Sequence, residues 1–292
     1  MRNKYKTGNL IWPSVIKAML FVAGFAVMTL AVPAHADYSV GSKASYTGTI
    51  DEALYADMLA GKVTELGTGG RIDLDGEGDL EKVSLTAYGD IIENWQGNRY
   101  ASFCELIVDG YSYILEGDGI EDELYGVSLD GRTINLFLYD IGPSDDPSLT
   151  FLNYKDRTLQ ECGTIETYPE TLFVNGNKIN AIERCRVIET GSIYTLWEYL
   201  ENDTLREVDL DVYEFAYPLG NEWHAYLKTD LDVMDGEDHV TTIHPQKVMF
   251  AYTDRESRVY VVGEDGSCGW MNTEDYGYSG STDLFDGLVM AD

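Results

Sequence analysis

The residues best suited to chemistry lie in one short acidic run, Asp73-Leu74-Asp75-Gly76-Glu77-Gly78-Asp79-Leu80-Glu81. Hard cations such as Ca²⁺ need about six to eight oxygen ligands at about 2.3–2.6 Å, so a short loop must curl round the ion. The two glycines permit that curl because glycine tolerates positive φ. The run therefore predicts a calcium site. Its expected ligands are the odd positions, with the fourth of them acting through its backbone carbonyl: Asp73, Asp75, Glu77, Asp79 and Glu81.

The run differs from an EF-hand, because Ser84 stands where the bidentate glutamate belongs and a strand pattern follows. It resembles instead the calcium loops of FG-GAP/VCBS-type repeats, whose pattern is roughly D-x-[DN]-x-D-G-x-x-D ahead of a strand. The resemblance covers about 71–88 and departs from the pattern at Glu77 and Glu81. It implies a β-propeller blade of the kind found in extracellular surface proteins. The segment 127–142 repeats the pattern of the acidic loop and its following strand more weakly. The two copies indicate two blades or hairpins of one repeated unit, and chance similarity between them is the alternative.

The sequence contains no catalytic motif of the serine-hydrolase, zinc-protease, Walker or dinucleotide-binding type. Asp145 and Asp146 are adjacent in a proline-containing loop, which favours a turn over an acid–base pair. His239 and His244 lack a defined third zinc ligand. The leading hypothesis is a non-enzymatic binding protein. The alternatives are a secreted glycan or cell-wall hydrolase with an unlocated carboxylate pair, and a structural protein whose acidic loop binds nothing.

The elements that must position the acidic loop are predicted to be mostly β-strands. A lead-in segment, 37–70, contains one weakly amphipathic helix within 51–62. Asp109-Gly110 and Asn175-Gly176-Asn177 predict two hairpin turns. Further strands are expected at 83–88, 133–139, 193–200, 205–215, 248–252 and 258–262. The predicted fold class is all-β, with an irregular propeller- or sandwich-like domain over 71–235.

The segment 240–275 resembles a bacterial SH3-like module. Two predicted strands precede Asp265-Gly266-Ser267-Cys268-Gly269-Trp270, which matches the D-G-x-x-G-W turn of that family. The resemblance implies a small barrel that serves interaction, commonly with cell-wall peptides. On that basis Trp270 is a candidate ligand contact, with packing as its alternative role. Residues 276–292 are then an acidic tail.

The N-terminus predicts a secretory signal peptide. A basic start is followed by an apolar stretch over 18–32 and by the cleavage pattern Ala34-His35-Ala36. Removal of 1–36 would give a secreted protein of the extracellular space or cell envelope, with no membrane attachment; an uncleaved anchor is the alternative. The net charge of −31 argues against nucleic acid and anionic lipid as partners, because both require Lys and Arg. The expected partners are a cell-wall peptide or glycan, or another extracellular protein.

The chain has four cysteines: Cys104, Cys162, Cys185 and Cys268. An even number in a secreted chain permits two disulfides, whose connectivity the sequence leaves open. Cys162 and Cys185 are the nearest pair and the first candidate for a bridge, and isolated buried thiols are the alternative. The spacings match no zinc pattern.

Overall fold

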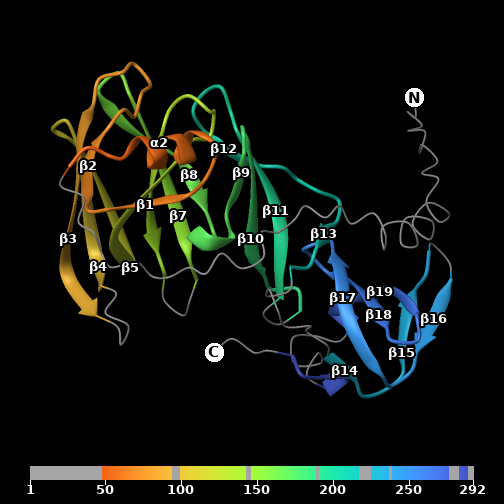
Figure 1. Ribbon diagram of the computed structural model, residues 1–292. Coiled ribbons are helices and arrows are strands. Elements are labelled where there is room, and N and C mark those ends of the chain that lie inside the picture. The colour runs from red at the N-terminus through yellow and green to blue at the C-terminus, as the bar shows by residue number, and fades with distance from the viewer. Residues whose placement is uncertain are drawn as a thin grey trace, which may run out of the picture.

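The computed structural model describes residues 48–93, 99–142, 146–188, 191–216, 225–236, 239–275 and 283–288. In these ranges the protein is almost entirely β, with three antiparallel sheets and one short α-helix (Figure 1). The predicted all-β fold is confirmed, and the continuous first sheet corresponds to the sandwich-like alternative. No helix in the described ranges is long and apolar enough to cross a membrane. The predicted signal peptide lies outside them.

The first sheet is a meander in which most strands pair with the next strand in sequence, so short hairpins suffice as connections. The predicted turn at Asp109-Gly110 is confirmed: both residues have positive φ, as a two-residue hairpin of type I′ requires. The strand order is β2 (Gly69–Ile72), β3 (Glu81–Glu93), β4 (Arg99–Val108), β5 (Tyr111–Val127), β6 (Asn135–Asp140), β7 (Ser148–Lys155) and β8 (Thr158–Ile165), with β1 (Thr64–Gly67) paired to β5.

This sheet is buried on both faces near β6. Leu136 and Leu138 enter a first core on one side, and Phe137 and Tyr139 enter a second core on the other. The first core is closed by α2 (Glu52–Leu59), whose Met58 is fully buried. This helix confirms the one predicted within 51–62.

The middle sheet packs on the second core. Its order is β12 (Leu205–Glu207), β11 (Gly191–Tyr199), β10 (Lys178–Cys185) and β9 (Phe173–Asn175), preceded by the 3₁₀ turn η1 (Pro169–Thr171). The predicted hairpin at 175–177 is confirmed as the β9–β10 connection. Strand β10 contributes to two cores. Its Ile179 and Ala181 belong to the second core, and its Cys185 belongs to a third core.

The C-terminal sheet surrounds this third core. Its order is β16 (Val240–Ile243), β15 (Leu231–Met234), β19 (Cys268–Asn272), β18 (Arg258–Gly263), β17 (Lys247–Thr253), β14 (Ala225–Leu227) and β20 (Phe285–Asp286); β13 (Tyr213–Glu214) pairs with β17, and η2 (Thr273–Asp275) follows β19. The strand pair predicted at 248–252 and 258–262 is confirmed as β17 and β18.

Two local predictions are corrected. The single strand expected over 205–215 is two short strands, because β12 pairs with β11 and β13 pairs with β17, so the chain crosses between sheets here. The bridge between Cys162 and Cys185 is not formed, because the two lie in different cores; all four cysteines are free. Burial raises the pKa of the Cys104 and Cys162 thiols to about 12, so both are poor nucleophiles.

Candidate functional site

The acidic run forms the loop between β2 and β3, where Ile72 pairs with Glu81 across the hairpin. Leu74 anchors the loop: its side chain is fully buried in the first core, and its carbonyl accepts a 2.8 Å hydrogen bond from the Ile134 N–H. A buried apolar residue in an otherwise polar loop fixes the backbone on both sides of it. The carboxylates of Asp73 and Asp75 are therefore held in place by the core.

Side-chain to backbone hydrogen bonds give the loop its curl. The two carboxylate oxygens of Asp73 accept from the N–H groups of Gly76 and Gly78, at 2.8 and 3.1 Å. Asp75 accepts from the Glu77 N–H at 3.0 Å. Each carboxylate oxygen has two lone-pair sites, so these bonds leave capacity for a further partner.

Three of the five predicted ligands converge. One carboxylate oxygen from each of Asp73, Asp75 and Glu81 lies within 4.8 Å of the others. Two oxygens bound to one Ca²⁺ at about 2.4 Å can be at most about 4.8 Å apart, so the group has the dimensions of a single-ion site. Glu81 is only 5 % exposed, and its Oε2 accepts a 2.7 Å hydrogen bond from the Leu74 N–H. The side chains of Glu77 and Asp79 are exposed and remain outside the group.

Burial and neighbouring charges act together on this group of carboxylates. Burial raises the pKa of the Glu81 carboxyl, the Leu74 N–H counteracts this, and the charge of Asp75 raises it again. Burial likewise raises the pKa of Tyr55, as do the charge of Asp73 and a hydrogen bond to it. Like charges held this close destabilise one another unless a proton or a cation compensates them.

The weaker sequence copy lies beside the acidic loop. Its turn connects β5 and β6, and the Arg132 carbonyl lies 2.8 Å from where a Cβ on Gly76 would be. Asp130 in this second loop accepts from the N–H groups of Arg132 and Thr133, both at 2.8 Å. Both copies are therefore hairpin loops of the same sheet, and only the first has converging carboxylates.

The contact between the loops makes Gly76 a sensitive position. Gly76 and Gly78 both have left-handed φ, of 76° and 91°, but only Gly76 has a backbone atom in the way of a Cβ. We expect Gly78→Ala to cost about 1 kcal/mol through strain alone. Gly76→Ala should cost about 2–3 kcal/mol, since the Arg132 carbonyl must also move. Urea unfolding with unchanged m-values would measure both; equal losses would contradict the close approach.

A second polar feature lies where the C-terminal sheet meets the middle sheet. Glu183 on β10 is 3 % exposed and accepts hydrogen bonds of 2.6 Å from the Thr195 hydroxyl and the Trp197 indole N–H. Arg255, in the turn between β17 and β18, reaches Glu183 at 3.3 Å and also pairs with Glu207 on β12. We call these five residues the polar seam. It separates the second core from the third.

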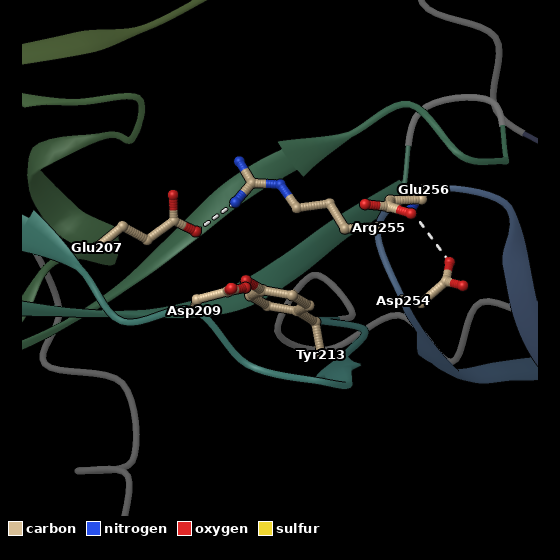
Figure 2. A pocket seen from close by; sticks show the side chains of 6 residues that line it. All are labelled: Glu207, Asp209, Tyr213, Asp254, Arg255 and Glu256. Atoms are coloured by element: carbon tan, nitrogen blue, oxygen red, sulfur yellow. Dashed lines mark hydrogen bonds and ion pairs between the residues drawn. The ribbon is translucent and has the colours of Figure 1, made fainter. Parts of the chain in front are cut away.

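A cavity of about 450 Å³ opens at this seam (Figure 2). The Arg255 guanidinium lies 5.7 Å from the centre of the Tyr213 ring and is bonded to Glu207. The cavity is lined by Glu207, Asp209, Tyr213, Asp254, Arg255 and Glu256. Sequence reasoning missed this site. The available signal was Glu183, a charged residue at an inward position of an alternating strand.

The hydrogen-bond partners of Asp254, one of the acids that line the cavity, do not suit a general acid. Asp254 accepts from the N–H groups of Glu256, Ser257 and Arg258 and from the Arg258 side chain. Burial raises the pKa of Asp254, but these hydrogen bonds outweigh it and the net shift is downward. A general acid requires the opposite shift. Asp145, part of the other carboxylate pair considered above, lies outside the described residues.

Trp270 lies on β19, half-buried, on the face of the sheet opposite the third core. Its ring meets Tyr260 edge to face at 5.3 Å, and the Arg258 guanidinium lies 5.4 Å above it. Both predicted roles are therefore compatible with its position, since the ring packs on neighbours and is still partly accessible.

Comparison with known proteins identifies no family. No protein-family model and no curated protein matches the chain. A solved structure described as that of a Xanthomonas Type IV Secretion System related protein aligns with 73% of this chain and 98% of its own, at 12% identity and a TM-score of 0.31. A similarity this low supports no argument about fold or function.

Proposed function

We propose that the protein is a non-enzymatic binding protein of the extracellular space or cell envelope, whose fold is stabilised by one Ca²⁺ in the loop 73–81. The observation that carries the calcium assignment is the convergence of Asp73, Asp75 and Glu81 around one point. The signal-peptide pattern supports the location. Extracellular modules bind calcium at about 10⁻⁴–10⁻³ M, an affinity within reach of three carboxylates and backbone oxygens.

Calcium would act on stability because the site exists only in the folded chain. At about 2 mM Ca²⁺ and a Kd of about 10⁻⁴–10⁻³ M, an ion that binds the native state alone stabilises it by about 0.6–1.8 kcal/mol. For a chain of this length that corresponds to a rise of about 1–7 °C in Tm. We therefore expect the purified protein to melt higher in about 2 mM Ca²⁺ than in EDTA. The double variant Asp73→Asn/Asp75→Asn should melt at one temperature in both.

A matched control has the same charge change and spacing elsewhere. Glu116 and Asp118 are exposed on β5, two residues apart, and lie outside the converging group. Glu116→Gln/Asp118→Asn should keep the full calcium-dependent rise. Equal midpoints for the wild type with and without calcium would refute the site, and a rise retained by the Asp73/Asp75 variant would refute these ligands.

The alternative of a secreted glycan or cell-wall hydrolase receives less support. Such an enzyme needs a carboxyl with a raised pKa facing a second carboxylate in a cleft. The described cavity offers Asp254 with a lowered pKa, and Glu207 is engaged by Arg255. Cell-wall peptide or glycan and another extracellular protein remain the proposed partner classes.

A further inference from the structure

The outer face of the C-terminal sheet carries a continuous row of large side chains. Tyr252 pairs with Tyr260, Tyr260 with Trp270, Trp270 with Met234, and Met234 with Val240. Residues directly opposite one another in antiparallel strands lie on the same face. These five residues, which we call the aromatic row, therefore cross β17, β18, β19, β15 and β16, neighbouring strands of one sheet (Figure 1).

The aromatic row lies on the face opposite the third core. The residues that alternate with it along the same strands, such as Val259, Val261 and Met271, belong to that core. Met234 is 39 % exposed and Val240 56 %. Tyr260 is 9 % exposed because Tyr252 and Trp270 flank it, with ring centres at 6.1 and 5.3 Å. Met234 and Val240 are exposed and Tyr252 and Trp270 are half-buried, so the row lies at the surface, with Tyr260 as its covered member.

The charges beside the row are mainly acidic. Glu214 on β13 pairs directly with Tyr252 and is exposed, which extends the row to a sixth strand and ends it in a carboxylate. Asp235 follows Met234 at the other side; burial and the hydrogen bond to Cys268 raise the pKa of Tyr260 most, and the charge of Asp235 adds to them. The chain as a whole carries −31. A cationic partner is therefore attracted to this face over long range, whereas an anionic one is repelled.

The row already holds one cation. Arg258 places its guanidinium 5.4 Å from the centre of Trp270, while Asp254 accepts from its Nε at 2.7 Å. This arrangement, a cation over an aromatic face with a carboxylate beside it, is favourable at a surface. Glu214 and Tyr252 offer the same pair of groups, an acid and a ring, at the far end.

We propose that the aromatic row docks an extended segment of a partner protein bearing arginine or lysine, with the cations over the rings and paired with Glu214. Six strands spaced about 4.8 Å apart span about 24 Å, which an extended segment of about seven residues covers. This inference deepens the proposed binding function by naming its partner class, and it does not depend on calcium.

The test is binding of a fluorescent octapeptide of alternating arginine and serine to the purified protein at about 0.15 M salt, in calcium and in EDTA. We expect Glu214→Gln to weaken binding about twofold to fivefold through the loss of an exposed ion pair. Arg258→Gln should tighten it about threefold, because it removes a competing cation from Trp270. Both side chains are exposed, and Asp254 keeps three backbone N–H donors when Arg258 is replaced, so we expect the fold to persist in both variants.

Glu116→Gln is the matched control, since it removes the same charge from an exposed strand of the first sheet. Equal weakening by Glu214→Gln and Glu116→Gln would show attraction to net charge alone and overturn the proposal. Binding of a neutral chitin oligosaccharide lost in Tyr252→Ala, with no peptide binding, would assign the row to glycan instead. Either failure leaves the calcium-dependent Tm rise intact, so the two proposals are tested separately.

Discussion

Replacing Arg255 with methionine is expected to destabilise the protein by about 3–5 kcal/mol at neutral pH, as removal of one partner of a buried ion pair generally does. Glu183 would stay 97 % covered with only the neutral Thr195 hydroxyl and Trp197 indole as partners. Methionine fills most of the volume of the arginine stem, so packing on Tyr213 is largely kept. The loss therefore measures the uncompensated charge.

The pH dependence identifies the charge responsible. Burial raises the pKa of Glu183 in the folded protein, and hydrogen bonds from Thr195 and Trp197 and the charge of Arg255 oppose this. The variant lacks the opposing charge, so its Glu183 pKa rises further. A carboxyl with a raised folded pKa contributes stability that is complete below the unfolded pKa and is lost as pH rises through the folded value. The deficit of Arg255→Met should thus shrink toward pH 4.5, the ordinary value.

Arg206→Met is the control for this experiment. Arg206 also pairs with a glutamate, Glu198, but its side chain is 62% exposed. An exposed pair contributes about 0–1 kcal/mol, with little pH dependence above the ordinary glutamate range. Urea unfolding of both variants at pH 5 and pH 8 gives the comparison. Similar losses in the two variants, or a deficit that stays constant with pH, would show that the Glu183 charge is not what Arg255 compensates.

Local chemistry explains which parts of the structure could be predicted. The Asp109-Gly110 turn follows from residues that tolerate positive φ between two apolar strands, and it forms as expected. The acidic loop is likewise local, because its ligand spacing and its glycines lie within nine consecutive positions. Its convergence on Glu81 depends only on the hairpin that pairs Glu81 with Ile72.

The rest depends on contacts between distant residues. Arg255 reaches Glu183 across 72 positions of sequence, and nothing near either residue identifies the other. The aromatic row joins Met234 to Trp270 through a strand order, β15 beside β19, that skips three strands of the chain. The break in the strand expected over 205–215 has the same cause, since an apolar alternation does not reveal that its two ends join different sheets.

Phe250→Ala should have the second large effect, a loss of about 3–5 kcal/mol. Phe250 is fully buried in the third core, with the Phe285 and Phe215 ring centres at 5.2 and 6.4 Å. That core also contains Ile193 of β11, which bridges to Phe215. Amide hydrogen exchange on the full chain should therefore show protection falling together in β18 and β11.

The matched control lies on the same strand with the opposite orientation. Met249 is 38 % exposed on the outer face, so Met249→Ala should cost less than about 1 kcal/mol. If β11 kept its protection in Phe250→Ala while β18 lost it, the C-terminal sheet, which contains the segment 240–275 that resembles an SH3-like module, would unfold as a unit of its own. Joint loss would mean that the middle sheet and C-terminal sheet share one folding unit, because a cavity in a common core weakens every element packed on it. The polar seam at Glu183 would then lie inside that unit, and its ion pair with Arg255 would contribute to the stability of both sheets.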